Sequence, residues 1–221
     1  MNIILIGAQG SGKGTQASLL VQSLGIVHIA SGDLFRVVSQ EQTELGEKIR
    51  SYLDKGELVP DEITVQMILN RISKADCASG VLLDGFPRTV AQAQALDKGL
   101  QGAGQYIDMV IYLKVPREEL ISRLSGRYIC QAQQHVYNIY SNPPKVPGLC
   151  DIDGSKLYQR SDDRGEALEK RLNIFFTETI RLLDYYRAEN RLVEVDGEQA
   201  IDQVHVELMK IIKNWDRSPP K

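Results

Sequence analysis

The chain has 221 residues, and its 26 lysines and arginines against 29 aspartates and glutamates give a formal net charge of −3. This length and a hydrophobic content of 43% are enough for one large globular unit, and they exclude disorder as a description of the whole chain. The near balance of charge disfavours a dedicated nucleic-acid-binding protein, which usually carries a basic surplus. Because no apolar run reaches the roughly 18 residues of a membrane span and the three cysteines are too few for a disulfide framework, we expect a cytosolic protein.

Short apolar runs alternate along the chain with segments of helical periodicity. The runs Asn2–Gly7, Val81–Leu83, Met109–Val115 and Leu192–Val195 predict strands that are buried on both faces. His28 is expected beside a strand, with a structural role. Strands that alternate with helices over most of the length predict a parallel α/β sheet with helices on both sides.

Two segments interrupt this alternation. Ser31–Pro60 is polar and helical in pattern and offers no strand, so it predicts a small helical insertion. Gly126–Asp163 is rich in proline and glycine, has β-type residues around Tyr137–Tyr140, and is too long for an ordinary loop. It predicts a small flap with its own structure, for which Gly126 and Gly165 are candidate hinges.

A glycine-rich segment, Gly7–Thr15, directly follows the first predicted strand. Its glycines at positions 7 and 12, followed by Lys13, fit the phosphate-binding loop, in which backbone N–H groups and a helix N-terminus surround a phosphate. The match departs from the strict motif at Gly14, where Ser or Thr is expected and Thr15 follows one residue later. The segment predicts binding of a nucleoside triphosphate, but it does not by itself separate a kinase from a GTPase switch.

A second group of polar residues follows the strand predicted at Val81–Leu83. Asp84 ends that strand, and such an aspartate can help to hold Mg²⁺ through water. Arg88 and Gln92 are four residues apart, so a helix that starts near Thr89 would place both on one face. A cation and an amide on that face could hold a phosphate and read the edge of a base.

With Gln159–Asp163 and Arg171, these motifs resemble adenylate kinase in the long-lid form of that family, nearly colinearly over the whole chain. The resemblance implies an α/β P-loop kinase fold with a five-stranded parallel sheet flanked by helices. It also implies a core of residues 1–29, 60–125 and 164–221, a helical NMP-binding insertion at 30–59 and a small β-rich lid at 126–163. The implied activity is reversible transfer of the terminal phosphoryl group of ATP to AMP, giving two ADP, with Mg²⁺. We expect a cytosolic monomer that binds neither nucleic acid nor membrane.

The resemblance assigns roles to individual residues. The expected ATP-binding residues are Gly10, Ser11, Gly12, Lys13, Gly14, Thr15, Arg127, Val136, Tyr137 and, through its backbone, Gln199. The expected AMP-binding residues are Ser31, Arg36, Glu57, Leu58, Val59, Gly85, Phe86, Pro87, Arg88, Gln92, Arg160 and Arg171. The expected catalytic cations, which would stabilise the transferring group, are Lys13, Arg88, Arg123, Arg127, Arg160 and Arg171.

Arginine spacing suggests how these cations share a cleft. Arg123 and Arg127 are four residues apart on a predicted helix, and Arg160 and Arg171 are eleven apart, close to three helical turns. Either pair could line a closed cleft. In the alternative interpretation, such arginines form surface ion pairs with Asp163 and its acidic neighbours.

Two cysteines lie in the predicted lid, Cys130 and Cys150, with Asp153 three residues after the second. Many long-lid relatives hold zinc there through Cys-x-x-Cys paired with Cys-x-x-Cys or Cys-x-x-Asp. Gln133 occupies the second ligand position here, and glutamine is a poor zinc ligand. His135 lies two residues further on and would lengthen the turn. The sequence therefore favours reduced thiols in a zinc-free lid and assigns no metal ligand, with a structural zinc as the alternative.

Three other functions stay open. A kinase for UMP or CMP is disfavoured by the long insertion at 126–163, because those relatives usually have a short lid. A nucleotide-dependent switch would use water as the acceptor, which leaves Arg88 and Gln92 without a task. A non-catalytic member would use the lid as an interaction ribbon, and the intact Lys13 disfavours it.

Overall fold

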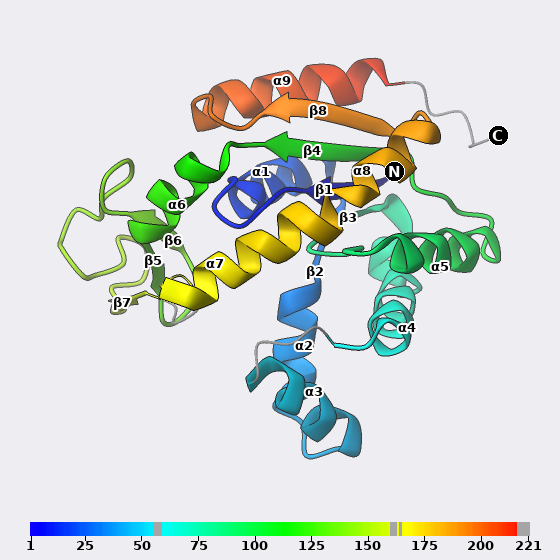
Figure 1. Ribbon diagram of the computed structural model, residues 1–221, viewed down its shortest axis with the longest axis horizontal. Helices are drawn as coiled ribbons and strands as arrows, with labels where there is room; N and C mark the ends of the chain where they lie inside the picture. Colours follow the sequence, from blue (N-terminus) through cyan, green and yellow to red (C-terminus); the bar gives the residue numbers. More distant parts are fainter. Residues whose placement is uncertain (55–58, 160–162, 164, 216–221) are drawn as a thin grey trace.

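A five-stranded parallel sheet forms the centre of the protein in the computed structural model, which describes residues 1–54, 59–159, 163 and 165–215 (Figure 1). Its strand order is β2-β3-β1-β4-β8. The strands are β1 (Asn2–Ile6), β2 (Val27–Ala30), β3 (Val81–Asp84), β4 (Met109–Lys114) and β8 (Leu192–Asp196). Four of these strands, β1, β3, β4 and β8, confirm the strands that were predicted from apolar runs. The pattern did not predict β2, because only Ile29 of its four residues is buried.

Helices cover both faces of the sheet, as predicted. In β1, Ile3 and Leu5 pack toward one face, and Ile4 and Ile6 toward the other. The first face is covered by α1 (Lys13–Leu24) and α9 (Ile201–Asn214). The second is covered by α4 (Asp61–Ile72), α5 (Val90–Gln101), α6 (Arg117–Ser125), α7 (Gly165–Ile174) and α8 (Arg181–Ala188). A 3₁₀ turn, η1 (Ala75–Ser79), precedes β3, and a π-helical segment, η3 (Phe175–Thr179), joins α7 to α8.

Two smaller parts project from this core in different directions (Figure 1). One consists of α2 (Ser31–Ser39) and α3 (Glu44–Asp54), which enclose a cluster of Phe35, Ile49 and Val59. The other is an antiparallel sheet of order β6-β5-β7. Its strands are β5 (Arg127–Cys130), β6 (Val136–Asn138) and β7 (Leu157–Tyr158). The predicted α/β class with a helical insertion and a small β-rich lid is confirmed.

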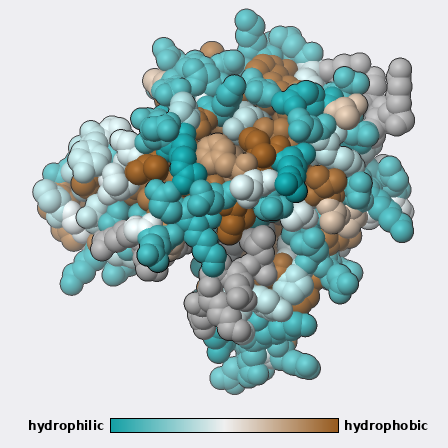
Figure 2. Space-filling model, viewed as in Figure 1, coloured by the Kyte–Doolittle hydropathy of each residue, from teal (hydrophilic) through white to brown (hydrophobic). Residues whose placement is uncertain are grey.

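The face of the molecule seen in Figure 2 is mainly hydrophilic. Figure 2 shows hydrophilic side chains over most of the viewed face, with apolar side chains gathered toward the middle, where helices cross the sheet in Figure 1. Within the described ranges, no helix has the length and apolar character needed to cross a membrane.

The face between α1 and α9 gives a test of the core. Leu20 of α1 is fully buried, so Leu20→Ala should lower the free energy of unfolding by about 2–5 kcal/mol through lost burial and the cavity left behind. Val206 of α9 is 67% exposed, and Val206→Ala should change it by less than about 0.5 kcal/mol. Urea denaturation of both variants measures the difference, and equal effects would contradict this packing.

Candidate functional site

The loop between β1 and α1 has the geometry of a phosphate-binding loop. Gly10 and Gly12 have φ angles of 83° and 90°, a left-handed conformation that glycine adopts without strain. A Cβ on Gly7 would lie 2.5 Å from Ser11 Oγ, so the close turn also excludes a side chain there. Gly12 is the N-cap of α1, which directs the free N–H groups of that helix start toward the loop.

Lys13 lies at the mouth of this loop. Its Nζ donates hydrogen bonds to the carbonyl oxygens of Gly7, at 2.6 Å, and Ala8, at 2.9 Å. Burial lowers the pKa of Lys13 from 10.5 to about 8; Asp84 opposes this effect, and the charges of Arg88, Arg127 and Arg171 add to it. Because charges affect one another in this way only at short range, four of the predicted catalytic cations lie near one point.

Asp84 is the negative group beside Lys13. It ends β3, and its side chain is 16% exposed. His28 Nε2, on the neighbouring strand β2, lies 3.6 Å from Asp84 Oδ2. Burial raises the pKa of Asp84, but His28 and Lys13 outweigh it, so the net shift is below the ordinary value. The carboxylate of Asp84 therefore stays charged at neutral pH. An aspartate that helps to hold Mg²⁺ needs this charge.

Residues predicted for the second nucleotide meet at the end of β3. Ser31 Oγ, at the start of α2, donates to Gly85 O at 2.9 Å, and Arg88 Nε donates to the same oxygen at 2.7 Å. Gly85 has a φ of 75°, and a Cβ there would lie 3.0 Å from Ser31 Oγ. Phe86 is 1% exposed within the core, and Pro87 is buried as well, so these two offer a ligand mainly their backbone.

The prediction that Arg88 and Gln92 share a helix face was wrong. Helix α5 begins at Val90 with Thr89 as its N-cap, so Arg88 precedes the helix. The two residues still interact, because the backbone N–H of Arg88 donates to Gln92 Oε1 at 2.7 Å. Gln92 Nε2 donates to Asp61 Oδ1 at 2.7 Å, which fixes the orientation of this buried amide.

Of the residues predicted in the helical insertion, Arg36 and Val59 are described. Arg36 is half exposed and pairs with Asp33 one turn earlier in α2. Val59 is 5% exposed and packs in the small cluster of the insertion. The predicted ligands Glu57 and Leu58 lie outside the described residues.

Two lid-side arginines converge on one buried carboxylate. Arg127 Nε donates to Asp163 Oδ2 at 2.9 Å, and Arg171 lies 3.9 Å from Asp163 Oδ1. Asp163 is 1% exposed, so these are not the surface ion pairs of the alternative interpretation. The predicted ligand Arg160 lies outside the described residues.

The prediction that Arg123 and Arg127 share a helix face was also wrong. Helix α6 ends at Ser125 with Gly126 as its C-cap, and Arg127 begins β5, so Arg123 and Arg127 do not share a helix face. Arg171 lies in α7, and the predicted spacing of eleven residues from Arg160 involves a position outside the described residues. The convergence comes from separate elements rather than from spacing along one helix.

Arg123 has other partners than Arg88, Arg127 and Arg171. Its Nε donates to Glu119 Oε1 at 2.7 Å, and its Nη1 donates to the carbonyl oxygen of Gly197 at 2.9 Å. Gln199 follows in the same loop after β8, and its side chain donates to Glu207 Oε2 at 2.8 Å. The structure thus brings the predicted residues Arg123 and Gln199 to one region, at the carboxyl end of β8.

The predicted pair Val136 and Tyr137 divides between two faces of the lid. Val136 is 52% exposed, whereas Tyr137 is buried and its hydroxyl lies 3.4 Å from Cys150 Sγ. The side chain of Tyr137 therefore belongs to the interior of the lid, and only its backbone is open to a ligand. The predicted loop residues Gly14 and Thr15 are exposed on the first turn of α1.

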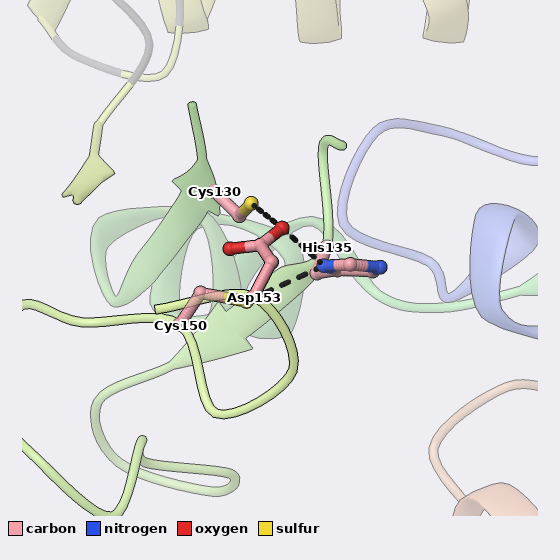
Figure 3. Close-up of side chains that lie close together, drawn as sticks. All are labelled: Cys130, His135, Cys150 and Asp153. Carbon is pink, nitrogen blue, oxygen red and sulfur yellow. Dashed lines mark hydrogen bonds and ion pairs between the residues drawn. The ribbon is translucent and has the colours of Figure 1, made fainter. Parts of the chain in front are cut away.

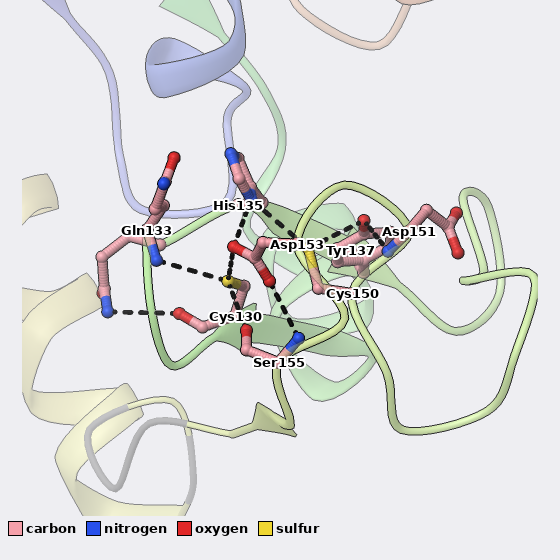
Figure 4. Close-up of polar contacts among 9 residues, drawn as sticks. Cys130, Gln133, His135, Tyr137, Cys150, Asp151, Asp153 and Ser155 are labelled. Carbon is pink, nitrogen blue, oxygen red and sulfur yellow. Dashed lines mark hydrogen bonds and ion pairs between the residues drawn. The ribbon is translucent and has the colours of Figure 1, made fainter.

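Four side chains of the lid lie close together: Cys130, His135, Cys150 and Asp153 (Figure 3). One ligand atom of each lies within 4.8 Å of all the others, so these residues could hold a metal ion. His135 Nδ1 lies 3.3 Å from Cys150 Sγ, whereas the side chain of Gln133 is exposed and its backbone N–H donates to Cys130 Sγ at 3.4 Å (Figure 4). Two thiols, an imidazole and a carboxylate suit zinc, which the sequence left as the alternative.

Two contacts of the site were not predicted, that of His28 with Asp84 and that of Asp61 with Gln92. The contact of His28 was not predicted because the pattern did not show strand β2; a glycine before and a polar helix after a four-residue segment were the only signals of that strand. Asp61 and Asp163 act over 31 and 36 residues of sequence separation, on Gln92 and Arg127. A pattern among neighbouring residues cannot predict a contact between two residues that are so far apart in the sequence.

A phosphate-binding loop at the carboxyl end of a parallel sheet, with arginines from three separate segments around its lysine, defines a P-loop nucleotide-binding protein. The second group of residues around Gly85 lies beside that loop, because β1 and β3 are neighbouring strands.

Comparison with known proteins identifies the family. The family model described as adenylate kinase matches residues 5–191. Similar proteins include the adenylate kinases of Bacillus velezensis, 48% identical over 96% of this chain and 98% of the relative, and of Carboxydothermus hydrogenoformans, 48% identical over 96% and 100%. That of Bacillus subtilis is 47% identical over 96% of this chain and 98% of the relative. The chain belongs to the adenylate kinase family, as its motifs predicted.

The lowered pKa of Lys13 gives a test of the phosphate site by pH. The charged ammonium predominates below pH 8 and is lost above it, so affinity for a nucleoside triphosphate should fall as pH rises from about 8 to 10. The fall should approach tenfold per pH unit, measured by calorimetric titration. Lys13→Arg keeps its charge over this range, so its affinity, although weaker, should not show the same fall. A flat profile for the unmodified protein would contradict the assignment.

Proposed function

We propose that the chain catalyses reversible transfer of the terminal phosphoryl group of ATP to AMP, giving two ADP, as a monomer in the cytoplasm. Adenine nucleotide homeostasis would be its role. The observation that carries this proposal is the presence of two sites on neighbouring strands: the phosphate-binding loop with Lys13 after β1, and the meeting of Ser31 and Arg88 at Gly85 after β3. Two phosphate-binding regions on neighbouring strands suit a donor and an acceptor that are both nucleotides.

On the donor side, Gly10–Thr15 surround the phosphates of ATP with backbone N–H groups. Lys13 places its ammonium against the outer phosphates and follows the transferred group. Arg123 donates to Gly197, where a Cβ would lie 3.4 Å from Ser11 O of the phosphate-binding loop, and we assign it to the transferring phosphoryl group. The backbone of Gln199, two residues further on, would contact the adenine of ATP. Arg127, with the Val136–Tyr137 backbone, covers the nucleotide from the lid.

The acceptor side begins where Ser31 and Arg88 meet at Gly85. Arg88 holds the AMP phosphate, Arg36 supports it from α2, and Gln92 faces the base. The hydrogen bonds to Gln92 from Arg88 N and to Asp61 orient the amide, so it reads a base edge in one orientation. The insertion, residues 30–59, would cover AMP as the lid, residues 126–163, covers ATP, with Arg160 bridging both nucleotides.

Transfer needs no nucleophilic side chain, because an oxygen of the AMP phosphate attacks the γ-phosphorus and ADP leaves. The γ-phosphoryl group spreads negative charge over its oxygens in the transition state, and Lys13, Arg127 and Arg171 stabilise that charge. Adenylate kinases use Mg²⁺ with ATP, and the charged Asp84 beside the loop fits that ion, which neutralises charge on the phosphate oxygens. Closure of the lid excludes water, which would otherwise compete as the acceptor.

Removal of the loop lysine gives the first test of this proposal. Lys13→Met should lower kcat by about 100- to 1000-fold in a coupled assay of ADP formation from ATP and AMP, because one charged donor to the transferring group is lost. An acceptor screen with CMP, UMP and GMP belongs in the same assay. Preference for UMP or CMP over AMP would favour another monophosphate kinase, and ATP hydrolysis independent of any acceptor would favour a switch.

Arg88 gives a test of the acceptor side. Arg88→Lys keeps the charge but loses the bidentate guanidinium, so kcat/KM for AMP should fall about ten- to a hundredfold while KM for ATP stays within about twofold. Arg187→Lys is the matched control, because Arg187 is 53% exposed and pairs with Asp184 and Glu194 at the surface. Steady-state kinetics with each nucleotide varied in turn separates the two effects. An equal loss for both nucleotides would contradict an acceptor-side role.

A further inference from the structure

The loop between β8 and α9, residues 197–200, is fixed at its start. The backbone N–H of Gly197 donates to Lys114 O at the end of β4, at 2.9 Å, and its carbonyl oxygen accepts from Arg123 Nη1 at 2.9 Å. A Cβ on Gly197 would lie 2.6 Å from Val115 Cγ2 and 3.4 Å from Ser11 O. The start of the loop therefore packs closely against the phosphate-binding loop.

The far end of the β8–α9 loop is tied to helix α1. Gln16 of α1 is 3% exposed, and its Nε2 donates to the carbonyl oxygen of Ile201 at 2.8 Å. The backbone N–H of Gln16 donates to Gly12 O at 3.0 Å, so this residue lies in the first turn of the helix whose N-terminus faces the phosphates. One buried side chain thus joins the phosphate end of the site to the β8–α9 loop.

The middle of the loop is held by helix α9. The side chain of Gln199 donates through Nε2 to Glu207 Oε2 at 2.8 Å and to Asp196 O at 3.2 Å. Among the described residues, no lysine or arginine pairs with Glu207, so its carboxylate serves this amide rather than a surface ion pair. A hydrogen bond to a charged acceptor is stronger than one between neutral groups, and this one fixes how Gln199 lies.

These contacts leave the backbone of Gln199 open. In the part of the chain that the structure describes, neither its N–H nor its carbonyl oxygen has a hydrogen-bond partner. Its neighbours differ, because Glu198 N donates to Asp196 Oδ1 at 2.9 Å and Ala200 O accepts from Val204 N at 3.0 Å. An open donor and an open acceptor on one residue match the edge of adenine, where N1 accepts and the N6 amino group donates.

We propose that Glu207 and Gln16 are positioning residues that set the selectivity for adenine in the donor nucleotide. The inference rests on the ATP-binding half of the proposed function, in which the backbone of Gln199 contacts the base. Guanine and hypoxanthine have an acceptor, O6, and a donor, N1–H, where adenine has the reverse. While the loop is held at both ends and in its middle, its peptide groups cannot turn, so these bases would meet like groups and leave them unpaired. A loosened loop turns its peptide groups and accepts either kind of base.

Binding of ATP and ITP to the full-length protein tests this proposal, because the two nucleotides differ only at this edge of the base. Calorimetric titration without AMP should give a Kd for ITP at least about tenfold above that for ATP. That ratio should fall about fivefold in Glu207→Ala and in Gln16→Met, since each loses one hydrogen bond that holds the loop. The exposed Gln203, one turn earlier in α9, is the matched control, and Gln203→Ala should leave the ratio unchanged.

Exchange of the two paired side chains separates positioning from a general loss of packing. Gln199→Glu alone sets two carboxylates against each other and should lower the ratio as Glu207→Ala does. The double variant Gln199→Glu with Glu207→Gln rebuilds the amide–carboxylate hydrogen bond in the opposite direction and should restore the ratio. Affinity for AMP should stay within about twofold in all these variants, because the acceptor site does not include the loop.

Three results would overturn the proposal: equal affinity of the unmodified protein for ATP and ITP, a ratio that Glu207→Ala and Gln16→Met leave unchanged, or no recovery in the double variant. The titrations contain no acceptor, so they are independent of the reaction. A protein that binds ATP selectively through this loop but forms no ADP from ATP and AMP would contradict the proposed function and leave the positioning roles of Glu207 and Gln16 intact.

Discussion

Repulsion among like charges is the constraint on which the arrangement of this protein depends. Lys13, Arg88, Arg127 and Arg171 come from four separate segments and are close enough to lower the pKa of the lysine together. Such a group is unfavourable unless negative charge lies among it, and Asp84 and Asp163 supply part of that charge. A nucleotide with several phosphates supplies more, so charge repulsion in the protein becomes affinity for a polyanion. The net charge of the chain, −3, does not reveal this local excess of positive charge.

The sheet provides the framework that brings these segments together. Because β1 lies between β3 and β4 in a parallel sheet, the loops after β1 and β3 leave the same edge and face one another. Strand β2 pairs with β3 on its outer side, and α2 begins at once after it, so Ser31 reaches Gly85 across the edge. The helical insertion is thereby attached at the point where Ser31 and Arg88 meet at Gly85.

Sequence patterns predicted those parts of the structure that consist of a few consecutive residues. Buried strands and the phosphate-binding loop were predicted because each is defined by a few consecutive residues. The arginine positions failed at helix ends: Gly126 ends α6 just before Arg127, and Thr89 caps α5 just after Arg88. A spacing of four residues implies a shared face only inside a helix. The pairing of Gln92 with Asp61 and the burial of Asp163 against Arg127 depend on tertiary structure, which spacing does not contain.

The helices after the lid form a strut across the molecule. Helix α7 carries Arg171 near the lid, continues through the π-helical segment η3, and leads into α8. Tyr185 of α8 donates to Asp97 Oδ2 of α5 at 2.9 Å, and Arg191, just beyond α8, donates to the other carboxylate oxygen at 3.1 Å. The far end of the strut is thus anchored to the helix that carries Gln92. Arg171 and Gln92 are therefore joined through packed helices as well as through the central sheet.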